Sequence, residues 1–193
     1  VLGIQLRYEY TESIAQKIKK FIYKKVDSCR IPYSIKLENK DFVFFPLQVV
    51  TDSQLLDNSI VKQDQAILYT AKAIKKINET RSTPLYLVVK EHPRQECHNY
   101  LDRLRRVLDY RNIIFIRNGD ISYLVERCKA IVTINSSVGY LGLKRNKPVI
   151  AFGKSIYVRS GLVRNVENDG QLHNLLLEIL RNPTNYYSSE EKE

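Results

Sequence analysis

The sequence has no apolar run that approaches the ~20 residues needed to span a bilayer. Its first ten residues, VLGIQLRYEY, have neither the basic start nor the long apolar core of a secretory signal. It also lacks an initial methionine, so we expect the chain to be a piece of a longer protein. From these absences we expect neither a transmembrane segment nor secretion.

Cysteine is scarce, and its pattern excludes two classes of site. Cys29, Cys97 and Cys128 are odd in number, widely spaced and free of any CxxC pair. They therefore indicate neither a disulfide framework nor a zinc site, and are typical of the reduced thiols of a cytoplasmic protein. His98 and His173 do not supply metal-ligand spacing either. We expect a metal-independent protein without a cofactor.

Three nucleotide-binding and catalytic signatures are also missing. The sequence contains no GxGxxG of a dinucleotide-binding fold and no GxxxxGK[ST] of a P-loop. It contains no GxSxG nucleophile elbow. A dinucleotide-dependent oxidoreductase, a P-loop enzyme and a serine hydrolase are therefore not indicated.

Negative charge is in deficit. The formal net charge is +10 and the pI is about 9.5, which favours an acidic partner such as nucleic acid, anionic lipid, a nucleotide sugar or an acidic polysaccharide. Excess lysine that only keeps the protein soluble is the simpler explanation. The 13 tyrosines are spread through apolar positions rather than clustered with lysine and arginine, so no stacking platform for single-stranded nucleic acid is evident.

The order of apolar segments predicts an α/β fold. Short apolar runs indicate strands at 42–45, 85–89, 113–116, 131–134 and 149–152. Helical spacing is found at 60–77, 96–108, 121–128 and 171–180, and a short helix follows Ser137. Strands that alternate with helices predict a Rossmann-like, mainly parallel sheet with helices on both faces.

The chain divides into three predicted regions. Residues 1–41 hold a basic helix from Thr11 to Val26 and a connector, and residues 42–183 form the Rossmann-like domain. The helix suits a solvated surface position, with binding to an anionic membrane surface as the alternative. Residues 184–193 form an acidic tail that we expect to be disordered.

Polar residues follow three of the predicted strands, at the edge where parallel sheets bind ligands. The residues concerned are Gln48, Asp52 and Ser53, then Lys90, His92, Pro93 and Arg94, and then Asn135, Ser136 and Ser137, with Gly153 closing a fourth strand. The edge is basic overall and carries one carboxylate, Asp52, which suits a nucleotide held through its phosphate and sugar.

Each of these residues also has a simpler explanation. Asp52 fits a helix N-cap or an Asx-turn, and Asn135 or Ser136 fits an N-cap. His92 fits an ordinary exposed loop position, although the flanking Lys90 favours a phosphate site.

Three stretches, in this order, resemble the capsule polysaccharide biosynthesis proteins of Gram-negative bacteria: FPLQVVTDSQ, VKEHPR and INSSVGYLGLKRNKPVIAFGKSIY. That family includes transferases that add 3-deoxy-manno-octulosonic acid (Kdo) from CMP-Kdo to a lipid acceptor. The His-Pro and Ser-Ser pairs are also similar to those of bacterial CMP-sialic-acid-dependent transferases. Each motif alone is common, but their order and spacing over residues 42–157 are specific.

The resemblance implies the donor-binding lobe of a two-lobed glycosyltransferase-B fold. By position, His92 of the His-Pro pair with Ser136 and Ser137 would hold the CMP phosphate and ribose. Lys90 would add positive charge as the nucleotide leaves. Asp52, in a motif with Gln48 and Ser53, would lie near the anomeric carbon and could attack it in a retaining transfer.

The resemblance also implies partners and a location. The partners would be a CMP-sugar donor and a lipid-linked or oligosaccharide acceptor, not nucleic acid. The location would be cytoplasmic, with peripheral contact at the inner face of the inner membrane and with capsule assembly proteins.

This sequence departs from the family pattern in two ways. Glu91 adds a negative charge beside the His-Pro pair, and the chain has about half the length of a two-lobed transferase. Two alternatives stay open: a UDP- or GDP-sugar transferase of the same fold, and a non-catalytic basic module that binds nucleic acid or acidic polysaccharide.

Overall fold

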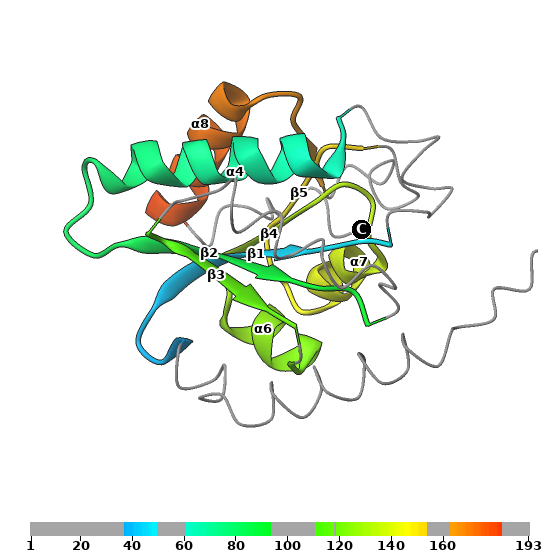
Figure 1. Ribbon diagram of the computed structural model, residues 1–193. Helices are drawn as coiled ribbons and strands as arrows, with labels where there is room; N and C mark the ends of the chain where they lie inside the picture. Colours follow the sequence, from blue (N-terminus) through cyan, green and yellow to red (C-terminus); the bar gives the residue numbers. More distant parts are fainter. Residues whose placement is uncertain (1–36, 50–60, 94–110, 118, 154–162, 183–193) are drawn as a thin grey trace, which may run out of the picture. The chain divides into compact units, whose positions relative to one another are not determined.

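Six parallel strands form one sheet in the computed structural model of the chain (Figure 1). The structure describes residues 37–49, 61–93, 111–117, 119–153 and 163–182. The strands are β1 (Asp41–Pro46), β2 (Leu85–Lys90), β3 (Ile113–Ile116), β4 (Ala130–Thr133), β5 (Val149–Ala151) and β6 (Arg164–Asn165). Their order in the sheet is β3-β2-β1-β4-β5-β6.

This order places the change of winding direction between β1 and β4. The chain adds β2 and β3 on one side of β1, then returns to place β4 on its other side and continues outward to β6. A strand order of 3-2-1-4-5-6 is that of a doubly wound Rossmann sheet, whose ligands bind where the order reverses. The predicted parallel α/β fold is confirmed.

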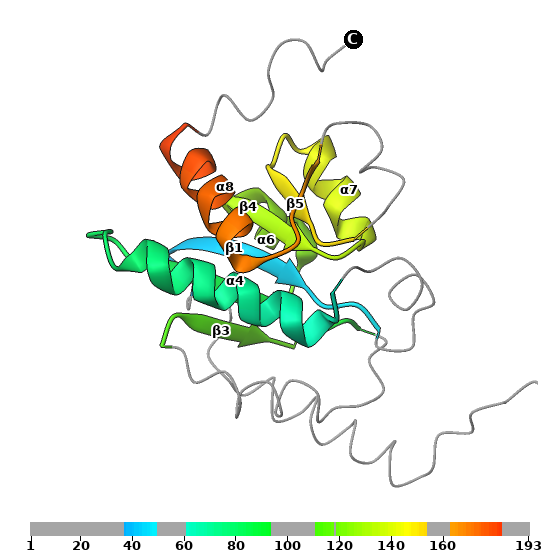
Figure 2. The same ribbon diagram turned by 90° about the horizontal axis from the view of Figure 1, so that it is seen from above.

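Four described helices cover the two faces of the sheet. They are α4 (Gln63–Asn78), α6 (Ile121–Arg127), α7 (Ser137–Lys144) and α8 (Asp169–Arg181). Helices α4 and α8 lie on one face, and α6 and α7 lie on the other (Figures 1 and 2). Since both faces are covered, the central strands read as continuous apolar runs, as in the buried Phe42–Phe45 segment of β1.

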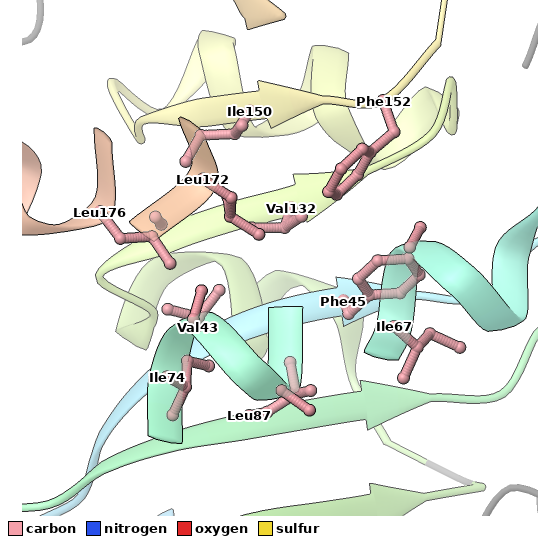
Figure 3. Packing of buried hydrophobic residues seen from close by; sticks show 14 of the residues in the cluster. Val43, Phe45, Ile67, Ile74, Leu87, Val132, Ile150, Phe152, Leu172 and Leu176 are labelled. Carbon is pink, nitrogen blue, oxygen red and sulfur yellow. The ribbon is translucent and has the colours of Figure 1, made fainter. Parts of the chain in front are cut away.

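The main hydrophobic core lies between the sheet and the pair α4 and α8 (Figure 3). Its labelled side chains include Val43, Phe45, Leu87, Val132 and Ile150 from four strands and Ile67, Ile74, Leu172 and Leu176 from the two helices. Burial of one such side chain contributes about 1.5–3 kcal/mol. This layer therefore holds the strand ends at fixed positions relative to each other.

Helix α7 packs against β4 and β5 through its glycines. Gly139 and Gly142 are buried, and a methyl group on Gly142 would overlap Ile131 and come within 3.1 Å of Val149 Cγ2. The helix ends in a Schellman motif: Asn146 has a φ of 52°, its N–H donates to Leu143 O, and the Lys147 N–H donates to Gly142 O. The C-terminal end of this short helix is therefore fixed.

Several predicted boundaries are corrected by the structure. The strand predicted at 131–134 is Ala130–Thr133, and the strand predicted at 149–152 ends at Ala151, because the β4–β5 ladder ends at that pair. Helix α4 begins at Gln63, since residues 61 and 62 are not helical. Helix α8 begins two residues earlier than predicted, because the Asn168 side chain caps it by accepting from the Gln171 N–H.

Two further predictions concern residues at the ends of elements. Pro46 is the last residue of β1, as expected of a residue that ends the ladder, and Asp120 caps α6. The two-residue strand β6 was not predicted, because Arg164 and Asn165 are exposed and polar. Predicted helices 11–26 and 96–108 and the tail 184–193 lie outside the described residues.

Of the three cysteines, Cys128 lies in the described part. It is buried, and burial raises the pKa of its thiol to about 12. In the described segments no helix combines the length and the apolar character needed to cross a membrane.

Candidate functional site

Four predicted site residues stand at equivalent positions on adjacent strands. Lys90 of β2 pairs with Pro46 of β1, and Thr133 of β4 pairs with Ala151 of β5. Between β1 and β4, Phe44 pairs with Ile131, and the same register continued by two residues brings Pro46 beside Thr133. Two residues beyond these four strand ends come His92, Gln48, Asn135 and Gly153. The structure therefore collects them at the carboxyl edge of the sheet, from β2, β1, β4 and β5.

Gln48 and Asn135 join the two strands at the point where the winding reverses. The Gln48 Nε2 group donates to Asn135 Oδ1 over 2.6 Å, and the Asn135 N–H donates to Gln48 Oε1 over 3.2 Å. Gln48 is buried, so its amide needs these partners. Two residues that were assigned to the site from sequence are thus in direct contact across 87 positions of the chain.

Gln63, the first residue of α4, extends this contact to a third element. The Gln48 N–H donates to Gln63 Oε1 over 2.7 Å, and Gln63 Nε2 donates to Gln48 O over 3.3 Å. Gln63 is also buried. A continuous run of amides therefore connects the start of α4, the end of β1 and the start of α7. We define Gln63, Gln48 and Asn135 as the amide relay.

The Ser-Ser pair opens α7. Ser136 is the buried N-cap: its hydroxyl accepts from the Val138 N–H, and its own N–H donates to Thr133 Oγ1. The capping explanation for Ser136 is therefore confirmed. Ser137, the first residue of α7, is exposed. A helix start of this kind is suited to an anion.

Lys90 is buried at the end of β2. It is 4% exposed, and its Nζ donates to the backbone carbonyl of Glu91 over 3.1 Å. Burial lowers the pKa of Lys90, and the nearby Glu91 carboxylate opposes that shift. Lys90 is therefore covered by the protein at the end of β2.

Glu91 has a cation of its own. It is buried, its N–H donates to Ile116 O, and its Oε2 lies 3.5 Å from Arg117 Nε, just beyond β3. The negative charge that departed from the family pattern is therefore balanced by Arg117 inside the protein. Glu91 fastens the end of β2 to the end of β3 beneath the His-Pro pair.

Some of the remaining predicted site residues lie in the described part of the chain. His92 is half-buried, Pro93 is exposed and Gly153 is buried. Because neighbouring strands are about 4.8 Å apart, the ends of β2 and β4, which are separated by β1, are about 10 Å apart across the sheet. Asp52, Ser53 and Arg94 lie outside the described residues.

Sequence reasoning missed Gln63, Thr133 and Arg117. No sequence pattern indicated a role for Gln63 or Arg117, because their partners are set by which strands become neighbours. Thr133 could have been noticed, since a hydroxyl three residues before Ser136 at a strand end can accept from a helix cap. Within the described part of the chain, no group of three or more His, Cys, Asp or Glu residues is placed to hold a metal ion.

The strand order defines a doubly wound Rossmann lobe, with a fold like that of glycosyltransferase-B lobes and of the epimerases. The model of the family described as capsule polysaccharide biosynthesis protein matches residues 4–184. The chain belongs to this family, as its three motifs indicated.

Among curated proteins, the chain is similar to the capsule polysaccharide export protein KpsS of Escherichia coli. The two are 27% identical over 160 residues, which cover 80% of this chain and 40% of KpsS. The chain thus spans less than half the length of the curated relatives it matches.

Two solved structures show the same fold at low identity. A Thermosulfurimonas dismutans KpsC β-Kdo 2,4 transferase has a TM-score of 0.53 and 19% identity, over 86% of this chain and 53% of that one. A UDP-GlcNAc 2-epimerase from Neisseria meningitidis bound to UDP-GlcNAc has a TM-score of 0.57 and 12% identity, over 90% of this chain and 44% of that one.

Proposed function

We propose that the chain is the donor-binding lobe of a glycosyltransferase of capsular polysaccharide synthesis that uses a CMP-activated sugar, with CMP-Kdo as the donor. The observation that carries the proposal is the line of His92, Gln48, Asn135 and Gly153, each two residues past the end of adjacent parallel strands, in a member of the capsule family. Nucleotides bind at this edge of doubly wound sheets.

The phosphate of CMP would bind between His92 and the start of α7. His92 follows β2, while Ser136 and Ser137 follow β4, so their donors approach the same space from two sides of β1. Backbone and hydroxyl donors at a helix start, together with an imidazole, match the oxygens of a phosphoryl group. Pro93 would hold His92 in an extended or turn conformation.

Lys90 would stabilise the departing nucleotide from below. Because its Nζ is bonded to the Glu91 carbonyl, we propose that it acts by its field and not by direct contact with the phosphate. A charge in a poorly solvated site acts over a longer range than one in water. The bond between the anomeric carbon and the phosphate oxygen breaks as CMP leaves with the electron pair.

Asp52 is proposed as the nucleophile of a retaining transfer. Its carboxylate would attack the anomeric carbon, and the acceptor hydroxyl would then displace it and lose its proton to a base. Ser53 would support Asp52 as part of the same motif. The proposed acceptor is a lipid or saccharide, which a second lobe would bind. We propose a cytoplasmic location at the inner face of the inner membrane.

Thermal stability with nucleotides tests the donor. CMP at millimolar concentration should raise the melting temperature by several degrees, because a ligand at 100 times its Kd adds about 2.7 kcal/mol. UDP and GDP at the same concentration should give a smaller shift, which separates the CMP reading from a UDP- or GDP-sugar transferase. His92→Ala should abolish the CMP shift.

His173→Ala is the matched control for that experiment. His173 lies on α8, its ring nitrogen lies 3.2 Å from the neighbouring Asn174, and we give it no role in the site. This variant should keep the full CMP shift. If wild-type protein shows no shift with CMP or CMP-Kdo, the proposed donor is wrong.

The name of KpsS, an export protein, favours a second candidate, a capsule component that binds without catalysis. Incubation of a full two-lobed protein with CMP-Kdo and acceptor separates the two, since only a transferase releases CMP in step with the glycosylated product. A basic module for nucleic acid would instead show binding that falls steeply with salt and has no nucleotide preference.

A further inference from the structure

Basic side chains gather at the amino edge of the sheet, opposite the edge that carries the candidate site. The strands begin at this edge, and α4, α6 and α8 end there with basic residues in their last turns (Figures 1 and 2). We define the basic rim as the cations at these helix ends and strand starts: Lys40, Lys75, Lys76, Arg81, Arg111, Arg127, Lys129, Lys147 and Arg181. The acids at the same helix ends and strand starts are fewer, namely Glu38, Asp41, Glu79, Glu126 and Glu178.

Helix dipoles explain only part of this positive charge. Cations at a helix end stabilise the helix, and the basic residues at the ends of α4, α6 and α8 follow that rule. Strands have only small net dipoles, yet a cation also precedes each of the strands from β3 to β5. In the order of the sheet these cations are Arg111, Arg81, Lys40, Lys129 and Lys147. Because neighbouring strands are about 4.8 Å apart, these strand starts span about 19 Å of the edge.

Much of the basic rim is open to solvent. Its exposed members are Lys75, Lys76, Arg111, Arg127, Lys129 and Arg181. The Asp41 carboxylate lies among the strand starts, but it is shared by Arg81 at 3.0 Å and Lys129 at 3.1 Å. One carboxylate therefore faces two cations, and the edge keeps a positive charge that an external anion can reach.

A hollow of about 290 Å³ lies beside the basic rim, between α4 and the start of β3. Its lining combines the apolar side chains of Ala71, Ile74, Leu87 and Ile113 with Lys75, Arg111 and Asn112. A phospholipid carries an anionic phosphate joined to apolar chains, so it matches both parts of this lining. A hydrophilic polysaccharide matches only the cations.

Nucleic acid fits the basic rim less well than a lipid surface does. Proteins that bind single strands stack the bases on exposed aromatic rings. Among the described residues, the exposed large hydrophobic side chain is Tyr140, which lies on α7 and outside the rim.

We propose that the basic rim is a docking surface for an anionic phospholipid bilayer. Each lysine or arginine near a negatively charged membrane surface adds to the attraction, which salt screens. The inference rests on the membrane location in the proposed function and gives that location a contact surface. It also turns the candidate site, at the opposite edge, away from the lipid and toward the solution that holds a soluble nucleotide sugar. It does not depend on which nucleotide binds.

Vesicle flotation of the full chain tests the inference. Wild-type protein should bind phosphatidylcholine vesicles that contain phosphatidylglycerol, should not bind phosphatidylcholine alone, and should be released by salt. The triple variant Lys76→Glu/Arg111→Glu/Arg181→Glu reverses three exposed cations of the basic rim. Its affinity for the anionic vesicles should fall by about tenfold or more.

The matched control makes the same change in net charge outside the basic rim. Lys62→Glu/Lys144→Glu/Arg164→Glu reverses three exposed cations on α4's N-terminal side, α7 and β6. Its affinity for the anionic vesicles should fall by less than about threefold, because charges far from the contact are screened. Equal losses in the two triple variants would overturn the inference, since net charge or another basic segment, such as the predicted helix 11–26, would then be responsible.

Two further outcomes would also overturn it. The first is wild-type protein that does not bind vesicles with phosphatidylglycerol. The second is a soluble polyanion, a DNA duplex or alginate, that binds as tightly as the vesicles and loses affinity equally in the rim variant, because the rim would then recognise charged polymers. If the triple variant does not fold, Arg111→Glu and Arg181→Glu are tested singly against Lys62→Glu, and losses no larger than that of the control contradict the inference.

Failure of this inference and failure of the proposed donor give different results. A wild-type protein without a CMP-induced shift in melting temperature that still binds anionic vesicles refutes the donor alone. A protein that shows the CMP shift but does not bind the vesicles refutes the docking surface alone. The rim variant should keep the CMP shift, because its substitutions lie at the opposite edge of the sheet.

Discussion

The two edges of the sheet are held together by different chemistry. At the amino edge, Asp41 bonds Arg81 at 3.0 Å and Lys129 at 3.1 Å, and all three side chains are a quarter to a half exposed. At the carboxyl edge, the side chains of Gln63, Gln48 and Glu91 are buried.

This difference indicates what each edge is for. Exposed ion pairs are adjustable and contribute little to stability. Buried polar groups fix one geometry and are costly to leave unsatisfied, so they suit an edge that has to keep ligand-binding groups in place.

Removal of Arg117 should produce the largest loss of stability. Arg117→Met removes an ion-pair partner of the buried Glu91 carboxylate, which should cost about 3 kcal/mol in the free energy of unfolding. The double variant Glu91→Leu/Arg117→Met should regain most of that loss. Urea unfolding measures both, and a single variant as stable as wild type would show that the pair does not hold the two strand ends.

Gly142→Ala should produce the next largest loss of stability. The added methyl group would overlap Ile131 in the core and force α7 away from β4 and β5, at a cost of about 1–3 kcal/mol. Because α7 carries Ser136 and Ser137, CMP affinity should fall as well. Gly170→Ala on α8 is the matched control, since its methyl group would meet only Asn168 Oδ1, at 3.4 Å. Equal effects of the two substitutions would contradict the close packing of α7.

Lys90→Met should raise stability, by about 1 kcal/mol at neutral pH, because an apolar side chain replaces a buried cation. The folded-state pKa of Lys90 is lowered, so the unfolded chain binds more protons between that value and the ordinary pKa of 10.5. Wild-type stability should therefore gain relative to the variant as pH rises through this window.

Thermal unfolding of both proteins between pH 7 and pH 10 measures the difference in stability between the variant and the wild type. A stability difference that widens as pH rises would contradict the lowered pKa of Lys90. If Lys90 also stabilises the departing CMP, the variant should transfer sugar more slowly even though it is more stable.

Asp41→Asn at the amino edge should have the smallest effect. It removes both ion pairs, yet each is partly exposed, so the free energy of unfolding should fall by less than about 1 kcal/mol. The CMP-induced shift in melting temperature should be unchanged, and a reduced shift would show that the two edges are coupled.

The fold could be predicted because its determinants are local. The FVFF run in β1 and the apolar faces of α4 and α8 specify a covered parallel sheet before any contact is known. The candidate edge could also be predicted, because a polar residue just past a parallel strand can lie only there, as Gln48 and Asn135 do.

The partners within the edge could not be predicted. The bonds from Gln63 to Gln48 and from Arg117 to Glu91 depend on which strands are neighbours, and a single sequence does not specify that order. The burial of Lys90 could not be predicted for the same reason. A lysine that ends a strand is ordinarily exposed, and whether other parts of the protein cover it depends on the tertiary structure.

A crystal structure of the protein soaked with CMP would show directly where the phosphate binds. We expect the phosphate at the carboxyl edge between β2 and α7, within hydrogen-bonding distance, about 2.7–3.2 Å, of Ser136, Ser137 and His92. CMP bound at another surface, or a phosphate that meets none of these three residues, would contradict this expectation.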